Sequence, residues 1–205
     1  FSAMKIFKMY TSNINDRFMD EVIDTLTDGG IVIYPTDTLY AIGCNALNNS
    51  AIERICKLKG INPQRTNLSV VCSDISQASQ YARIDNRAFQ LLRENLPGAF
   101  TFILPAASTL PKVFKGRKTV GIRVPDNVIA REIATRLGNP ILTTSIEWDD
   151  DPEDGCNPQA IAMKYEGMVD IVIDGGYGEL IPSTIVDCTD SANPEIIREG
   201  KGELN

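Results

Sequence analysis

The sequence predicts a mixed α/β domain in which a highly twisted sheet of parallel and antiparallel strands is flanked by helices. Short apolar runs typical of buried strands alternate with segments whose apolar residues recur at helical spacing. The alternation fails at both ends of the chain, where strands follow one another, so a purely parallel sheet is not expected. The 205 residues suffice for one domain with a full core. We therefore expect a single α+β domain of the α/β type, built on about seven strands.

The opening strand is the apolar run 31–34, which stops at Pro35 because proline cannot donate to a sheet ladder. Residues 44–47 form a short extension after a bend at Gly43. Further apolar runs, bounded by proline, glycine or polar residues, predict the other strands. These runs are 68–72, 99–104, 119–124, 141–144, 169–173, 185–188 and 194–198.

Helices are expected between these strands. In the first one, Phe18, Val22 and Leu26 lie four positions apart and so share one face. Capping residues mark the starts of others, and glycine marks several of their ends. The expected helices are 15–28, 51–59, 74–81, 85–95, 126–137 and 157–165. The chain has no GxGxxG and no Walker A lysine loop, so a nucleotide would be held in another way.

The amino-acid composition argues against several classes of function. The net charge of −7 argues against a surface built for indiscriminate nucleic-acid binding, but leaves room for a local basic groove. The chain has no histidine, which is the usual general base near neutral pH and the commonest metal ligand. Its five cysteines form no CxxC pair, which argues against a zinc site and favours a reducing compartment. We therefore expect no resident metal.

The start of the chain does not resemble a secretory signal peptide. No apolar run approaches the roughly 20 residues that span a bilayer, so no membrane partner is expected. Residues 1–3, before Met4, look like an expression-tag remnant. The domain is therefore expected to comprise residues 4–205.

Hydroxyl-bearing residues recur at the ends of expected strands. Thr36-Asp37-Thr38 follows the opening strand, Thr143-Thr144-Ser145 ends a later one, and Ser183-Thr184 enters another. Each segment alone is explained by a polar turn. Open α/β sheets also place ligand sites at strand ends, so together the segments indicate the walls of one cavity.

Two charged segments each leave two interpretations open. Segment 112–118 has four cations in seven residues and is either a solvated loop or a phosphate-facing patch. Segment 147–154 has six acidic groups in eight residues. A solvated, mobile loop is favoured there over a metal site.

Several short motifs occur in one order and together resemble the YrdC/YciO family, most of all its YciO branch. The resemblance extends from about Gly29 to Gly202, nearly the whole chain. The motifs are Gly29-Gly30, Tyr34-Pro35-Thr36-Asp37-Thr38-Leu39-Tyr40-Ala41-Ile42-Gly43, Lys59-Gly60, Pro97-Gly98-Ala99-Phe100-Thr101, Ile122-Arg123-Val124-Pro125, Thr144-Ser145, Pro182-Ser183-Thr184-Ile185-Val186-Asp187 and Arg198-Glu199-Gly200.

The resemblance implies a YrdC/RibB-like fold with a concave, positively lined cavity in a cytoplasmic protein. In the catalytic branch it implies L-threonylcarbamoyladenylate synthase, which joins threonine, bicarbonate and ATP, with Mg²⁺, into threonylcarbamoyl-AMP and pyrophosphate. A separate tRNA threonylcarbamoyl transferase then passes the group to an adenosine of tRNA. The family is also associated with double-stranded RNA binding. A non-catalytic protein that binds a nucleotide or structured RNA therefore remains the alternative.

The resemblance also assigns roles to individual residues. It implies that Thr38 contacts threonine and that Lys59 contacts the nucleotide phosphates, and these two are the candidate catalytic residues. The remaining contacts to threonine and bicarbonate are expected from Arg123, Thr144 and Ser183. The remaining nucleotide contacts are expected from Asn67, Thr101, Ser145 and Arg198.

The sequence departs from the synthase pattern at four places. Ile61-Asn62 stands where the synthases have Arg-Pro after the lysine and glycine, and Asn67-Leu68-Ser69 stands where they have Asn-Pro-Leu. Ser145-Ile146-Glu147 replaces Ser-Ala-Asn, and Cys72 stands where a histidine is expected. These departures fall on the ATP side of the expected site.

Overall fold

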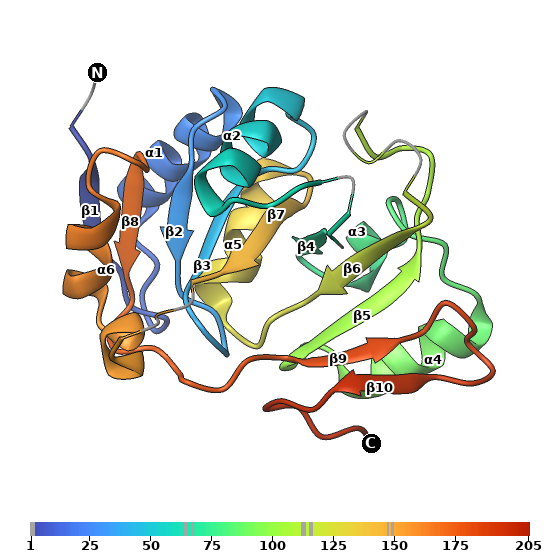
Figure 1. Cartoon of the computed structure of the whole chain (residues 1–205). Coiled ribbons are helices and arrows are strands. Elements are labelled where there is room, and N and C mark those ends of the chain that lie inside the picture. The colour runs from blue at the N-terminus through green and yellow to red at the C-terminus, as the bar shows by residue number, and fades with distance from the viewer. Residues whose placement is uncertain are drawn as a thin grey trace.

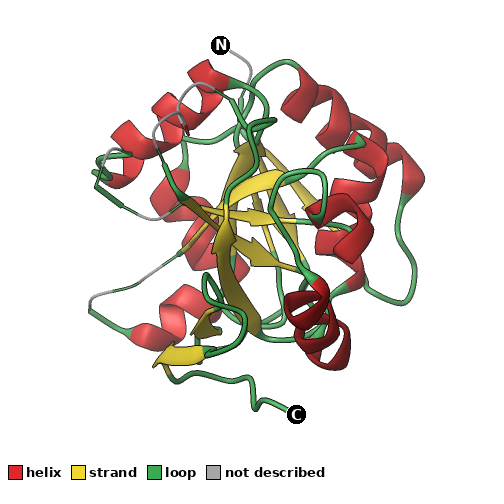
Figure 2. Cartoon of the chain, turned by 90° about the vertical axis from the view of Figure 1, so that its right-hand side faces the viewer, coloured by secondary structure: helices red, strands yellow, loops and turns green. Residues whose placement is uncertain are grey.

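The computed structural model describes residues 3–63, 65–66, 68–111, 114, 117–146, 148 and 150–205. Within these ranges the chain forms one ten-stranded mixed sheet with helices packed around it (Figure 1; Figure 2). The strand order is β1-β8-β2-β3-β7-β4-β6-β5-β9-β10. The strands are β1 Lys5–Lys8, β2 Val32–Tyr34, β3 Ala41–Asn45, β4 Ser69–Val71, β5 Phe100–Pro105, β6 Thr119–Arg123, β7 Ile141–Ser145, β8 Ile171–Asp174, β9 Thr184–Asp187 and β10 Glu195–Arg198.

The expected helices are all present in the described part of the chain. They are α1 Asp16–Thr27, α2 Asn49–Lys59, α3 Ile75–Ala78, α4 Asn86–Asn95, α5 Val128–Leu137 and α6 Pro158–Tyr165. The acidic segment, expected as a loop, runs into a short 3₁₀ helix, η2 Pro152–Cys156. None of the helices built from described residues has the length and hydropathy needed to cross a bilayer.

The expected number of about seven strands is too low, since the described residues form ten. β1 was missed because it has four residues, of which only Phe7 is buried, so it carries no apolar run. β3 begins at Ala41, not at residue 44, because the chain re-enters the sheet soon after the turn. There Ala41 pairs with Tyr34 of β2, and the two strands form an antiparallel hairpin.

β4 joins the two halves of the sheet. It pairs in parallel with β6 and antiparallel with β7, so Ser69 lies opposite both Gly121 and Thr143. In Figure 1, β1, β8, β2, β3 and β7 lie on the left, and β6, β5, β9 and β10 lie on the right. Arg123, at the end of β6, reaches the loop after β2, where it bonds to Thr38.

The core divides between the two faces of the sheet, because successive residues of a strand point to opposite sides. Val32 and Tyr34 belong to a cluster with apolar residues of α1 and α5. Ile33 and Ile42 belong to a larger cluster with residues of α2, α4 and α6. Helices therefore cover both faces and hold the twisted sheet in place.

Gly43 provides a stability test of this packing. A Cβ at Gly43 would lie 2.7 Å from Leu142 O and 2.9 Å from Tyr34 Cε1, closer than real contacts allow. Replacing Gly43 with alanine should therefore lower the free energy of unfolding by about 1–3 kcal/mol, as measured by urea denaturation. The control is Gly138→Asn, at a helix end where a Cβ meets nothing within 4 Å; its φ of 81° is a left-handed conformation that asparagine tolerates, so its loss of stability should be the smaller one. Equal stability of Gly43→Ala and the unaltered protein would contradict the described packing of β3.

Candidate functional site

The loop after β2 is a tight turn held together by its own hydroxyl groups. Thr36 Oγ1 accepts a hydrogen bond from Thr38 N at 3.0 Å and donates one to Leu39 O at 2.7 Å. The Oγ1 atoms of Thr36 and Thr38 lie 3.1 Å apart. Thr38 is only 1% exposed, so its side chain lies inside the turn. The turn is therefore a rigid support, since its polar groups bond to one another.

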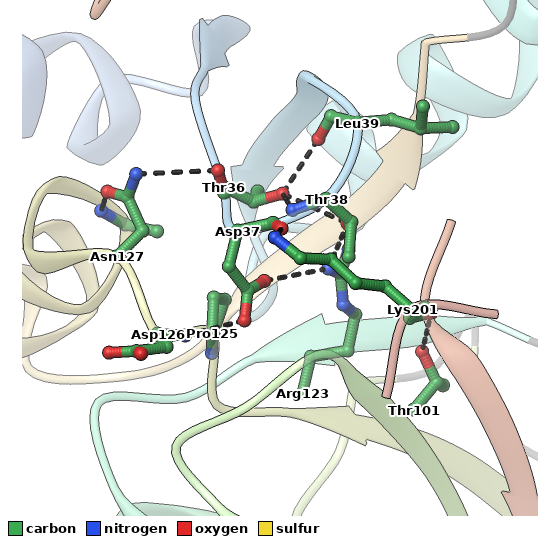
Figure 3. A network of polar contacts seen from close by, with 12 residues as sticks. Thr36, Asp37, Thr38, Leu39, Thr101, Arg123, Pro125, Asp126, Asn127 and Lys201 are labelled. Atoms are coloured by element: carbon green, nitrogen blue, oxygen red, sulfur yellow. Dashed lines mark hydrogen bonds and ion pairs between the residues drawn. The ribbon is translucent and has the colours of Figure 1, made fainter. Parts of the chain in front are cut away.

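Arg123, the last residue of β6, packs against this turn. Its Nη2 donates a hydrogen bond to Thr38 Oγ1 at 2.8 Å. Asp37 Oδ1 lies 3.8 Å from the same nitrogen, and Asp37 Oδ2 accepts a hydrogen bond from Asp126 N at 2.8 Å. Figure 3 shows the Asp37 carboxylate between the guanidinium and the main chain of Asp126. The turn thus holds a buried arginine whose side chain is 5% exposed.

The electrostatic environment of Arg123 is unusual for an arginine. Burial lowers the pKa of its guanidinium from the ordinary value and is the largest cause of the shift. The negative charge of Asp37 raises that pKa, whereas the nearby charge of Arg198 lowers it. Because a guanidinium stays protonated at neutral pH, Arg123 carries a buried positive charge.

Arg123 reaches a cavity of about 380 Å³ between β4, β5, β6, β7 and β9. Its lining includes three cationic side chains and many hydroxyl groups, and no aspartate or glutamate is among the described lining residues. The lining residues are Lys59, Ile61, Thr66, Leu68, Ser69, Thr101, Arg123, Thr143, Thr144, Ser145, Ser183, Ile185 and Arg198. Such a lining suits an anionic, polar ligand.

One side of the cavity is formed by hydrogen-bonded residues from β5, from the segment just before β9, and from β10. Thr101 Oγ1 and Ser183 Oγ are 2.8 Å apart and share a hydrogen bond. Arg198 donates to Ser183 O from Nη2 at 2.7 Å and from Nε at 3.1 Å. These contacts fix the orientation of Arg198, although its strand lies at the edge of the sheet.

The opposite side is formed by the end of α2 and the end of β7. Lys59 is the last residue of α2, and Gly60 ends the helix in the left-handed conformation with φ 65°. Lys59 Nζ donates a hydrogen bond to Ser145 O at 3.2 Å. The ammonium group is thereby held at the end of β7, beside the main chain of Ser145.

Tyr34 does not line the cavity but bonds to Thr143, which does. Its hydroxyl donates to Thr143 Oγ1 at 2.9 Å, and both side chains are buried. Burial raises the pKa of Tyr34 to about 12, so the phenol stays protonated at neutral pH and remains a donor. Because Tyr34 supplies this hydrogen, the Thr143 hydroxyl hydrogen is available to another acceptor, including a ligand.

The structure brings most of the predicted site residues together. The cavity is lined by Lys59, Thr101, Arg123, Thr144, Ser145, Ser183 and Arg198. Thr38 is not among the lining residues and instead lies behind Arg123, so its contact to substrate stays a prediction. Asn67 lies outside the described residues, as do Lys112 and Lys115 of the cationic segment.

The sequence analysis assigned no role to four lining residues, which are Thr66, Leu68, Ser69 and Ile185. It named Thr143 only as part of a cavity wall and gave it no ligand contact, although alternate residues of a strand share a face and Ser145 was assigned one. Ile185 directly follows the Pro-Ser-Thr motif. No signal in the sequence marks Ser69, which reaches the cavity through the pairing of β4 with β7.

A protein-bound metal does not fit the described part of this site. The lining offers hydroxyl groups and cations but no carboxylate among the described residues, and magnesium prefers carboxylate oxygens. Within the described residues, no group of three potential ligands from His, Cys, Asp and Glu comes together, including those of the acidic segment. Glu147 and Asp149 of that segment lie outside the described residues.

Comparisons with known proteins agree with the resemblance in the sequence. A family model named Sua5/YciO/YrdC, described as telomere recombination, matches residues 24–200. An uncharacterised protein of Haemophilus influenzae is 39% identical over 201 residues, which cover 97% of this chain and 96% of that protein. A threonylcarbamoyl-AMP synthase of Bacillus subtilis is 32% identical over 190 residues, covering 91% of this chain and 54% of the synthase.

Two solved structures share the fold. The crystal structure of Escherichia coli YciO has a TM-score of 0.89 and 36% sequence identity, covering 98% of this chain and 97% of that one. The crystal structure of P. abyssi Sua5 complexed with L-threonine has a TM-score of 0.85 and 27% identity, covering 95% of this chain and 57% of that one. The similar part of Sua5 is thus little more than half of its length.

Proposed function

Because the chain belongs to the Sua5/YciO/YrdC family, we propose that its cavity binds ATP and L-threonine and that it is an L-threonylcarbamoyladenylate synthase-type nucleotidyltransferase. The observation that carries this proposal is the lining of the cavity. It combines Lys59, Arg123 and Arg198 with hydroxyl groups and has no described carboxylate. The relative from P. abyssi, whose crystal structure holds L-threonine, supports the choice of amino acid.

The proposed reaction has two steps. The ammonium group of threonine loses a proton, and the resulting amine combines with bicarbonate, releasing water, to give an N-carboxylate. An oxygen of that carboxylate then attacks the α-phosphorus of ATP, the bond between the α- and β-phosphates breaks, and pyrophosphate leaves. The nucleophile belongs to the substrate, so the absence of histidine from the chain does not conflict with this chemistry.

The side chains of the cavity have the chemistry that these steps need. A buried guanidinium binds a carboxylate through charge-assisted hydrogen bonds, so we assign Arg123 to the carboxylate of threonine, with Thr144 and Ser183 beside it. Lys59 and Arg198 are assigned to the phosphates, where they would stabilise the charge that develops at the α-phosphate. Thr101, Ser145 and Asn67 complete the assigned nucleotide contacts.

The remaining assignments concern Thr38 and the partners. Thr38 is assigned to hold Arg123, to which it is hydrogen bonded, and to contact threonine. Mg²⁺ would enter with the phosphates of ATP, since the described residues form no site for it. The product would pass to a tRNA threonylcarbamoyl transferase, which makes tRNA the eventual acceptor.

A turnover assay tests this proposal. Purified protein is incubated with ATP, Mg²⁺, bicarbonate and threonine, and the release of pyrophosphate is measured. We expect release that requires both threonine and bicarbonate, together with a threonylcarbamoyl-AMP mass in the products. Failure of this assay, together with failure of the gene to rescue a strain that lacks its synthase, would reject the synthase assignment.

A second candidate is a family member that holds a nucleotide or double-stranded RNA without turnover. Ile61 favours it, because this apolar side chain lines the cavity where the resemblance expects an arginine. If this candidate is correct, the protein should bind a nucleotide without releasing pyrophosphate. If it binds RNA, its affinity for RNA should fall steeply as the salt concentration rises, because contacts to phosphates release counterions.

A further inference from the structure

The pair formed by Asp37 and Arg123 is buried but incompletely satisfied. The two side chains are 8% and 5% exposed, and the shortest distance between their charged atoms is 3.8 Å, from Asp37 Oδ1 to Arg123 Nη2. This separation is longer than a hydrogen bond, and Nη2 donates instead to Thr38 Oγ1. Asp37 Oδ1 and Arg123 Nε are the buried side-chain atoms that lack a hydrogen-bond partner among the described residues.

The charged side chains of Arg123 and Asp37 border two different hollows. Arg123 lines the cavity of about 380 Å³ assigned above to the ligand. Asp37 does not line that cavity; it borders a separate hollow of about 440 Å³ with Asp126 and Lys201. Lys201 Nζ bonds to the main-chain oxygen of Asp37 at 2.7 Å, not to its carboxylate. Figure 3 shows the carboxylate of Asp37 directed at Arg123 and Asp126.

We propose that Asp37 is the resident counter-ion of Arg123 and that it limits how tightly the cavity holds an anionic ligand. A buried charge without a partner strongly destabilises a protein, so Asp37 stabilises the empty site. A carboxylate bound to Arg123 from the cavity would share the guanidinium with Asp37, and two like charges repel more strongly in a buried site than in water. Asp37 therefore stabilises the empty protein and weakens the binding of an anionic ligand. This inference rests on the proposed function only where it names threonine as the ligand.

The test uses Asp37→Asn, which keeps the shape of the side chain and an acceptor for Asp126 N. Melting temperatures are measured in sodium chloride and in sodium acetate of equal ionic strength, with acetate as the carboxylate probe. We expect the variant to melt more than about 5 °C below the unaltered protein in chloride. Acetate should recover much of that loss, and the dissociation constant for L-threonine should fall about tenfold.

Two further variants separate the counter-ion role from a general loss of folding. The double variant Asp37→Asn with Arg123→Met removes both charges, so it should melt above Asp37→Asn alone. Asp126→Asn is the matched control, because its side chain is 75% exposed and its main-chain contact to Asp37 is kept. It should behave like the unaltered protein in both salts.

The inference is wrong if Asp37→Asn has the same melting temperature as the unaltered protein. It is also wrong if acetate raises the melting temperatures of the two proteins equally. It is also wrong if threonine binds the variant no more tightly than it binds the unaltered protein. Failure of the proposed function has a different signature, in which the unaltered protein binds neither threonine nor AMP. The acetate series and the double variant still decide the counter-ion role in that case.

Discussion

Replacing Arg123 with methionine is expected to lower the free energy of unfolding by about 3–5 kcal/mol, because the change leaves the carboxylate of Asp37 buried without its counter-charge. The same variant should lose at least about tenfold in affinity for L-threonine, the usual worth of a charge-assisted hydrogen bond. Urea denaturation measures the first effect, and calorimetric titration at a temperature where the variant is folded measures the second.

Arg131→Met is the control for this experiment. Arg131 lies on the neighbouring helix, donates to Pro125 O at 2.8 Å and pairs with an exposed carboxylate. Its removal should change stability by about 1 kcal/mol or less and leave threonine binding intact. If Arg123→Met and Arg131→Met were equally stable and bound threonine equally well, Arg123 would not be the centre of the site.

Replacing Lys59 or Arg198 with alanine is expected to weaken AMP binding by about 1.5–3 kcal/mol each, which raises the dissociation constant roughly 10- to 150-fold. Both residues line the cavity from opposite sides, and each offers a positive charge to a phosphate. Threonine binding should change much less, because its carboxylate is assigned to Arg123.

Lys57→Ala is the matched control for Lys59→Ala. Lys57 lies in the same last turn of α2, is exposed and is not among the residues that line the cavity. It should bind AMP like the unaltered protein. Unchanged AMP affinity in both Lys59→Ala and Arg198→Ala would show that the nucleotide lies elsewhere.

The helices and most strands were predictable because their signals are local. Asn157 followed by Pro158 marks the start of α6, and glycines end α2 and α5 in the left-handed conformation. β1 and the start of β3 were not predictable in this way. β1 pairs in parallel with β8, which is distant from it in the sequence, and the residues of β1 are mostly exposed.

The cavity was predictable in its members but not in their arrangement. Ordered motifs identified Lys59, Arg123 and Arg198, and the structure brings these three together. No sequence pattern could show that Thr38 accepts a hydrogen bond from Arg123 instead of lining the cavity, because the contact joins residues 85 positions apart. The direction of Asp37 depends on the same turn, so it too could be learned only from the structure.

The most direct test of the central proposal is a calorimetric titration of the unaltered protein with L-threonine, performed with and without saturating AMP. If one cavity holds a carboxylate at Arg123 and a phosphate at Lys59 and Arg198, each ligand should bind with one-to-one stoichiometry, and threonine should still bind when AMP is present. Competition between the two ligands, or binding of neither, would contradict the proposal.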